Sequence, residues 1–352
     1  MPSYAILCPG AFNYILNKTG NMLIRYFPDQ VVAVIDPDQA GKTAQDVLGY
    51  GGDIPVVPSV REALPMRPDT LLIGNAPQGG KFTDRIRTEI IAAIQGGCTI
   101  VSGMHTFMQD DPELSSLAQQ YQVRLVDLRR PPRPPHFPRG SWKTRSSPVL
   151  LVVGTDCDTG KMTTAWEITI RLRNRGRKVA FVGTGQTGIL LGGQGVPVDA
   201  VVADFMAGEV EYVLDQQPPD TDLIVVEGQG ALNNMFYSGV TLGLLHGAMP
   251  DWLVMTHEPV RKLDVTDYPM IEVPFALQLH LDLMRPFKQA RFLGANLLTF
   301  SQTEEDARRA IQAARDAWHL PVTDLIRFGD GDLIEAIDKE ITEWKSNTHA
   351  TD

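Results

Sequence analysis

The residues with the clearest chemical potential form a glycine-rich run, Gly-Thr-Asp-Cys-Asp-Thr-Gly-Lys-Met-Thr-Thr, at positions 154–164. The run follows an apolar stretch, residues 149–153, and precedes a helical pattern. A strand, a glycine-rich turn and a helix in this order are typical of a P-loop, whose backbone N–H groups converge on a phosphate. Lys161 adds a positive charge, and a hydroxyl at Thr163 or Thr164 could ligate Mg²⁺ or cap the helix. The predicted cofactor-binding residues of this run are Gly154, Thr155, Asp156, Cys157, Asp158, Thr159, Gly160, Lys161, Met162, Thr163 and Thr164.

The spacing of this run departs from the standard Walker pattern. Gly154 lies six positions before Gly160 rather than five, and Met162 stands where a serine or threonine usually follows the lysine. The hydroxyl of that serine or threonine is the usual magnesium ligand of a P-loop. Because Met162 lacks it, metal binding is left as an open alternative. Its predicted ligands are Thr163 and Glu227.

Three further residues with acid or base chemistry follow short apolar runs that predict strands. They are Glu227, His257 and Asp204. The carboxyl ends of parallel strands form the edge where ligands bind in open α/β sheets, so these side chains are candidate general bases. Structural roles would also explain the same positions. Glu227 and Asp204 could each cap a helix, and His257 could belong to a loop pair that only binds backbone groups. Neutral groups that could orient a carboxylate-bearing substrate are Gln186, Gln229, Tyr237 and Ser238.

The first half of the chain alternates β-branched runs with amphipathic segments, as in a parallel α/β sheet. The predicted strands span residues 4–7, 30–35, 70–73, 98–101 and 124–128. Residues 83–94 predict a helix, because Ile86, Ile90 and Ile94 share one face. The turn after the first strand lacks the GxGxxG fingerprint of dinucleotide-binding domains. We therefore expect a Rossmann-like domain over residues 1–128 without a standard NAD site.

A second alternation follows a proline-rich segment. Five prolines between Arg129 and Gly140 remove backbone donors, so residues 129–147 are predicted to be a linker. Beyond it, a C-terminal helix is predicted over residues 332–344, and the expected strands are residues 149–153, 178–182, 200–203, 223–226, 252–255 and 291–297. The predicted fold class is α/β, with a P-loop NTPase-like parallel sheet covered by helices on both faces over residues 148–352.

The composition argues against several kinds of partner. The chain of 352 residues is 43% hydrophobic, and no apolar run approaches the ~20 residues that span a bilayer. Its net charge of −10 opposes nucleic-acid binding. The three cysteines, Cys8, Cys98 and Cys157, form no CxxC pair, and the start of the chain lacks a signal-peptide pattern. We therefore expect a cytoplasmic protein whose partner is a small molecule, with no role for nucleic acid or membrane.

The run at 154–164 resembles the phosphate loop of dethiobiotin synthetases, which reads Gly-Thr-Asp-Thr, two variable residues and then Gly-Lys-Thr. Residues 227–230, Glu-Gly-Gln-Gly, are similar to the run whose glutamate helps to hold the metal in those enzymes. Residues 292–296 resemble their base-reading strand, which implies that Asn296 takes part in cofactor binding. Residues 183–186 lack the substrate lysine of such a synthetase, so we do not expect dethiobiotin synthesis.

Longer runs resemble a family whose members pair a Rossmann-like N-terminal half with a P-loop C-terminal half. These runs lie at residues 40–47, 76–80, 183–188, 203–205, 227–230, 237–247 and 257–259. Some members are D-glutamate N-acetyltransferases that use acetyl-CoA. The resemblance implies that the P-loop holds the phosphates of coenzyme A and that a small acidic amino acid accepts the acetyl group. Such proteins usually carry His-Pro shortly after Glu-Gly-Gln-Gly, where this chain has Asn-Asn-Met-Phe at residues 233–236.

Two other functions are compatible with the same residues. An ATP-dependent enzyme of the dethiobiotin synthetase kind would form an acyl phosphate with Mg²⁺ held at Thr163 and Glu227. A nucleotide-binding regulator would bind its ligand without turnover. Our leading expectation is an N-acetyltransferase with acetyl-CoA as cofactor, ATP with Mg²⁺ being the alternative. We also expect a homo-oligomer, as small-metabolite enzymes often are.

Overall fold

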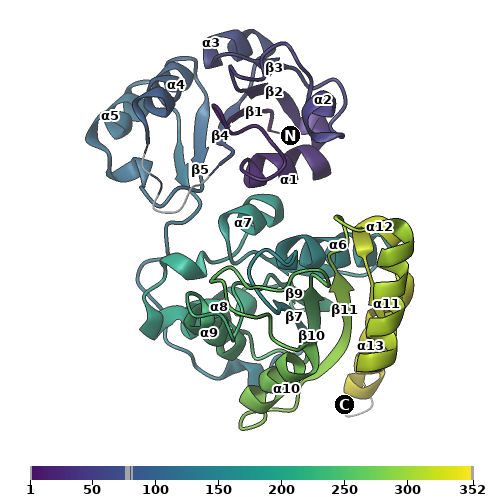
Figure 1. Cartoon of the computed structure of the whole chain (residues 1–352). Coiled ribbons are helices and arrows are strands. Elements are labelled where there is room, and N and C mark those ends of the chain that lie inside the picture. Colours follow the sequence, from purple (N-terminus) through teal and green to yellow (C-terminus); the bar gives the residue numbers. More distant parts are fainter. Residues whose placement is uncertain (1, 76–79, 81, 350–352) are drawn as a thin grey trace. The chain divides into compact units, whose positions relative to one another are not determined.

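The computed structural model describes residues 2–75, 80 and 82–349. The chain divides into two compact units, Met1–Arg130 and Pro131–Asp352, each built on a six-stranded sheet whose strands are all parallel (Figure 1). This confirms the predicted α/β class with two sheets. Most of the run at 76–80, which contributed to the family resemblance, lies outside the described residues. Within the described part of the chain, no helix is both long and apolar enough to cross a bilayer.

The N-terminal unit has the strand order β3-β2-β1-β4-β5-β6, which is the order of a Rossmann sheet. Its strands are β1 (Tyr4–Leu7), β2 (Val31–Ile35), β3 (Val56–Val57), β4 (Thr70–Ile73), β5 (Thr99–Ser102) and β6 (Leu125–Asp127). Its helices are α1 (Lys18–Tyr26), α2 (Ala44–Leu48), α3 (Val60–Ala63), α4 (Asp84–Gln95) and α5 (Pro112–Gln120). After β1, the carboxylate of Asp36 accepts the backbone N–H groups of Gly10 and Phe12. Asp36, the residue that follows β2, therefore stabilises the turn that follows β1.

The C-terminal unit has the strand order β12-β11-β10-β7-β9-β8. Its strands are β7 (Val149–Gly154), β8 (Val179–Val182), β9 (Leu223–Val226), β10 (Trp252–His257), β11 (Arg291–Leu297) and β12 (Val322–Thr323). Its helices are α6 (Lys161–Asn174), α7 (Gln186–Gly192), α8 (Ala203–Asp215), α9 (Ser238–Ala248), α10 (Val273–Met284), α11 (Glu304–Trp318), α12 (Leu325–Phe328) and α13 (Gly331–His349). β7 lies between β9 and β10, so the loops after these three strands open at one edge of the sheet.

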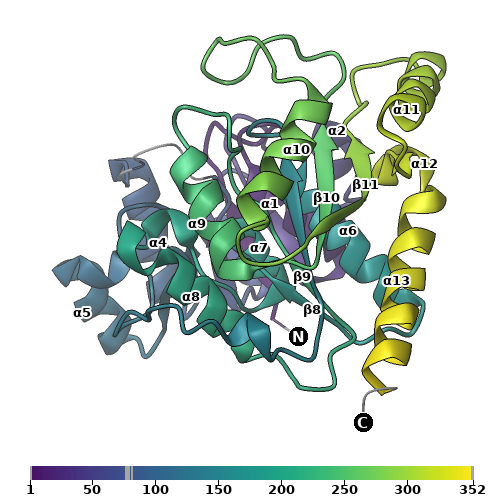
Figure 2. The same ribbon diagram turned by 90° about the horizontal axis from the view of Figure 1, so that it is seen from below.

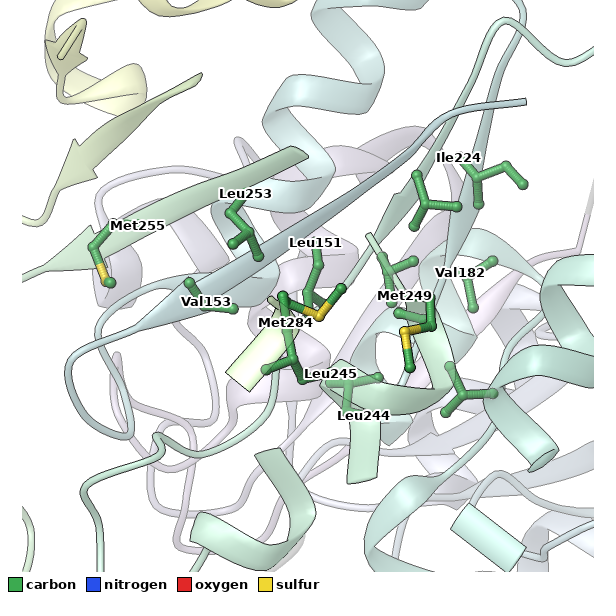
Figure 3. Packing of buried hydrophobic residues seen from close by; sticks show 14 of the residues in the cluster. Leu151, Val153, Val182, Ile224, Leu244, Leu245, Met249, Leu253, Met255 and Met284 are labelled. Atoms are coloured by element: carbon green, nitrogen blue, oxygen red, sulfur yellow. The ribbon is translucent and has the colours of Figure 1, made fainter. Parts of the chain in front are cut away.

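The core of this unit is formed where alternate residues of the central strands meet helices. Leu151 of β7 and Leu253 of β10 join one buried cluster with Leu245 of α9 and Met284 of α10 (Figure 3). Helices α8 and α9 lie side by side (Figure 2). The intervening residues of β7 point to the opposite face of the sheet, and α6 also packs against this strand. β7 is buried along its whole length, which fixes the position of the loop that follows it.

One predicted strand is wrong. Residues 200–203 do not form a strand, because a 3₁₀ turn (Val198–Ala200) is followed directly by α8, which begins at Ala203. A short apolar run cannot be assigned to a strand rather than a helix start by periodicity alone, and here Val202 is exposed. Asp204 is therefore not at the end of a strand. It is an exposed residue in the first turn of α8, where a carboxylate stabilises the helix dipole.

The proline-rich segment packs against α8. The backbone N–H of His136 donates to Glu209 at 2.8 Å, and the backbone N–H of Ser141 donates to Glu211 at 2.6 Å. A side chain at Gly208 would place its Cβ 2.1 Å from the carbonyl oxygen of His136, so glycine permits this close approach. The segment is thus attached to the C-terminal unit by two buried glutamates.

Candidate functional site

The run at 154–164 adopts the strand–turn–helix arrangement that the sequence predicts. Asp158 (φ +56°) and Gly160 (φ +86°) both have left-handed backbone conformations, and Gly160 is the N-cap of α6. Such conformations turn successive N–H groups towards one anion. At Gly154, a Cβ would lie 2.5 Å from Thr159 Oγ1 and 2.8 Å from Thr256 Oγ1, so only glycine fits between them. The loop therefore has the geometry of a phosphate cradle at a helix N-terminus.

Lys161 lies at the centre of this loop. Its side chain is buried, and its Nζ donates to the carbonyl oxygen of Asp156 at 2.5 Å. The turn after β9 packs directly against it. A Cβ at Gly228 would lie only 3.1 Å from Lys161 Cδ and 1.8 Å from the carbonyl oxygen of Val152, so there is no room for a side chain at this position. The glycine of the Glu-Gly-Gln-Gly run thus allows that turn to approach the loop.

The carboxylate of Asp156 binds protein groups from two other loops. Asp156 has no exposed surface; its Oδ1 accepts from Asn234 Nδ2 at 3.0 Å, and its Oδ2 accepts from Arg261 Nη1 at 3.0 Å and from the backbone N–H of Val265 at 2.9 Å. Asn234 belongs to the loop after β9, and the other two donors belong to the loop after β10. This side chain therefore joins three loops at the edge of the sheet.

Arg261 is a residue of the site that the sequence did not reveal. Besides Asp156, it binds the carbonyl oxygen of Cys157 at 2.8 Å through Nη1 and Glu258 Oε2 at 2.7 Å through Nε. In a trans peptide the N–H points away from the preceding carbonyl oxygen. By fixing the Cys157 carbonyl, Arg261 directs the N–H of Asp158 to the opposite side of that peptide. The only available signal was the position of Arg261, shortly after a strand that adjoins the P-loop strand.

His257 lies beside the P-loop, as expected. It ends β10, and its Nδ1 is 2.9 Å from Thr155 Oγ1. Burial, reinforced by the positive charge of Arg261, lowers the pKa of His257 to about 4. The imidazole is therefore neutral at pH 7, and its ring also packs edge-on against Trp318.

Glu227 is buried at the end of β9 and binds the turn after β8. Its Oε2 accepts the backbone N–H groups of Thr184 at 2.8 Å and Gly185 at 3.1 Å, while its Oε1 accepts from Gln229 Nε2 at 3.1 Å. A Cβ at Gly188 would lie 2.0 Å from Glu227 Oε2, so α7 also approaches closely. The carboxylate thus has a structural partner on each oxygen. The roles of Glu227 as a base or metal ligand stay predictions.

Most of the remaining predicted residues lie at the start of a helix, whereas Asn296 lies inside the protein. Asn296 ends up inside the protein, where it donates to Thr164 Oγ1 at 3.0 Å and accepts the N–H of Leu325 at 2.8 Å, so both ends of its amide are engaged. Met162 and Thr163 are in the first turn of α6. Among the described residues, no three His, Cys, Asp or Glu side chains gather as a metal site. The other predicted residues mark helix starts near the same edge, Gln186 at α7 and Tyr237 and Ser238 at α9.

Comparison with known proteins identifies the family of the chain. Residues 136–334 match a domain of unknown function described as the DUF1611_C P-loop domain, and residues 37–131 match the DUF1611_N Rossmann-like domain. A protein named D-glutamate N-acetyltransferase from Tritonibacter scottomollicae is 38% identical over 79% of this chain and 84% of its own length. One of the same name from Pseudoalteromonas sp. is 34% identical over 78% of this chain and 83% of its own length.

A solved structure supports the same assignment. The crystal structure of a DUF1611 family protein from Anabaena variabilis aligns with a TM-score of 0.90 at 33% identity, covering 96% of this chain and 100% of that chain. The match extends over both units, which confirms the pairing of halves expected from the sequence runs. The chain belongs to the DUF1611 family, with a Rossmann-like domain followed by a P-loop domain.

Proposed function

We propose that this protein is an N-acetyltransferase that transfers an acetyl group from acetyl-CoA to a D-glutamate-like amino acid. The observation that carries the proposal is the similarity to two proteins named D-glutamate N-acetyltransferase, at 38% and 34% identity over more than three quarters of the chain. The geometry of the P-loop supports it, because the loop provides the donors that a phosphate-bearing cofactor needs.

The residues of the loop fit a cofactor with phosphate groups. Lys161 and the N–H groups around Asp158 and Gly160 supply the positive side of the site. The buried acid of the loop, Asp156, is paired with Arg261, which reduces its repulsion of an anion. Acetyl-CoA, when bound, supplies an acetyl group activated as a thioester. The role of the protein is to bind the phosphates and to accept a proton from the amine.

We assign the proton acceptor to His257. An amino acid reaches the site as an ammonium ion, which must lose a proton before its nitrogen can attack a carbonyl carbon. His257 Nδ1 is hydrogen-bonded to Thr155 Oγ1, and in the tautomer in which Nδ1 donates this bond, Nε2 is the acceptor that we propose for the proton. The alternatives are weaker, because Glu227 is engaged by three N–H donors and Asp204 is exposed on α8. Gln186, Gln229, Tyr237 and Ser238 are the proposed contacts for the substrate carboxylates.

An activity assay with a matched control tests this proposal. The protein is incubated with acetyl-CoA and either D-glutamate or L-glutamate, and N-acetylated product is measured by mass spectrometry. We expect product with an acidic amino acid, and a loss of about 10²–10⁴-fold for His257→Gln. His319→Asn is the control, because His319 is exposed at the end of α11. Absence of product with every amino acid tried would reject the acetyltransferase.

A binding experiment separates this proposal from its rivals. Thermal shifts are compared for acetyl-CoA, coenzyme A, ATP with Mg²⁺, and NAD, because a ligand at 100 times its Kd adds about 2.7 kcal/mol of stability. Stabilisation by coenzyme A without Mg²⁺ is the expected result. Stabilisation by ATP and Mg²⁺ alone would indicate an ATP-dependent enzyme. Binding without product would indicate a regulator.

A further inference from the structure

Two loops beside the P-loop expose large apolar side chains. In the loop after β9, Met235 is 65% exposed and Phe236 is 67% exposed. In the loop after β10, Leu263 is 50%, Val265 42% and Tyr268 56% exposed. A single exposed apolar residue needs no explanation, but apolar residues gathered on neighbouring segments mark a binding surface.

The carboxylate of Asp156 places these two loops side by side. Asn234, which binds Asp156 Oδ1, also accepts the backbone N–H of Phe236 at 2.9 Å. The backbone N–H of Val265 binds the other oxygen of the same carboxylate at 2.9 Å. Phe236 and Val265 are thus each connected to one P-loop side chain through one or two hydrogen bonds. The backbones of these two residues are therefore close to the same side chain of the phosphate loop, and both side chains are exposed.

The loop after β10 is a built structure rather than a loose connection. Asp264 Oδ1 accepts the N–H groups of Thr266 at 2.7 Å and Tyr268 at 3.0 Å, and the N–H of Asp264 donates to the carbonyl oxygen of Tyr268 at 2.7 Å. Arg261 attaches the start of the loop to Asp156. The exposed side chains are therefore held in place by polar groups on the inner side of the loop.

We propose that these two loops form the subsite for the pantetheine arm of the acyl donor, with Met235, Phe236 and Val265 packing against it. This inference rests on the proposed function. Acetyl-CoA is charged at its phosphates and uncharged along the arm that ends in the thioester. The site has a similar division, with Lys161 in the phosphate loop and exposed apolar side chains on the two loops that bind Asp156. ATP has no such arm. Because Thr155 contacts His257 and the next residue, Asp156, holds both loops, these loops and the proposed proton acceptor adjoin the same stretch of the P-loop.

The test compares binding of acetyl-CoA with binding of 3′-phospho-ADP, which keeps the phosphates and lacks the arm. Calorimetry is carried out on the full chain and on the variant Phe236→Ser/Val265→Ser, whose changed side chains are both exposed. We expect acetyl-CoA to bind at least tenfold more weakly to the variant, the scale of burying one large apolar side chain. The affinity for 3′-phospho-ADP should change less than twofold. Phe287→Ser is the control, because Phe287 is 49% exposed and next to Lys288, which binds Asp251 at the opposite end of β10.

Each other result overturns the inference. Unchanged binding of acetyl-CoA to the variant would show that the arm lies elsewhere, while the proposed function would stand. Equal weakening of both ligands would show that these side chains affect the phosphates and make no separate contact with the arm. A change of oligomeric state in the variant, measured by size-exclusion chromatography with light scattering, would assign these side chains to contact with a second copy of the chain. Failure of the unchanged protein to bind acetyl-CoA would remove the proposed function itself.

Discussion

The ion pair between Asp156 and Arg261 should contribute more to the stability of the C-terminal unit than an exposed pair does. The side chain of Asp156 is 0% exposed and that of Arg261 is 21% exposed, with 3.0 Å between Oδ2 and Nη1. Removing one partner of a buried pair leaves the other charge without compensation, which costs about 3–5 kcal/mol. Arg261→Gln also loses its bonds to the Cys157 carbonyl oxygen and Glu258, so the single variant overstates the pair. A double-mutant cycle of Asp156→Asn and Arg261→Gln isolates the interaction, for which we expect about 1.5–3 kcal/mol.

The free energy of unfolding can be followed in the C-terminal unit alone. All five tryptophans follow residue 131, so their fluorescence in guanidinium chloride reports on this unit. The control cycle uses Glu304 and Arg308, an i,i+4 pair on α11 whose side chains are 66% and 61% exposed. Exposed pairs of this kind contribute about 0.3–0.5 kcal/mol. A coupling energy for Asp156 and Arg261 no larger than that of the control would refute the claim that this pair holds the loops together.

Two further predictions concern the P-loop lysine and a buried histidine. Lys161→Ala should weaken acetyl-CoA binding by about 2–5 kcal/mol, measured by calorimetry, because a charge-assisted contact to phosphate is lost; unchanged affinity would exclude Lys161 from the site. Burial lowers the pKa of His280 to about 4, so this side chain is neutral in the folded chain and takes up a proton more readily when unfolded. Its contribution to stability is present above pH 6.5 and is lost as the pH falls towards 4, about 3 kcal/mol in all. In denaturation series from pH 7 to 4, His280→Gln should therefore lose less stability than the unchanged chain, and an equal loss would contradict this assignment.

Local patterns predicted one element from each unit correctly. The strand expected at residues 149–153 is β7, which leads into the phosphate cradle, and the helix expected at residues 83–94 is α4 (Asp84–Gln95) of the N-terminal unit. In both cases the signal lies within the segment itself, as an apolar run or a repeated apolar face closed by glycine. β3 and β12 are two residues long and carry no such pattern. Their strand character comes from neighbouring strands, which only the assembled sheet supplies.

The partners of the P-loop could not be predicted in the same way. Arg261 is 105 positions after Asp156, and no local pattern connects them. The resemblance of residues 292–296 to a base-reading strand implied that Asn296 binds a cofactor; its amide binds Thr164 and Leu325, and its role with a ligand stays a prediction. The type of a residue indicates which chemistry is available to it. Whether that chemistry faces a ligand or the protein depends on contacts far apart in the chain.

The distribution of charge at this edge explains how a protein with a net charge of −10 can hold an anion. At an ionic strength of 0.15 M, exposed charges beyond about 8 Å are largely screened, so the local groups decide the potential. Three buried acids around the cradle have protein partners: Arg261 binds both Asp156 and Glu258, and Glu227 accepts three N–H groups. Lys161 and the amides that open α6 then supply the field that a phosphate meets. Neutralising Arg261 should consequently weaken anion binding even though this side chain faces the protein, and a cofactor affinity unaffected by Arg261→Gln would show that the pairing of acids is irrelevant to the site.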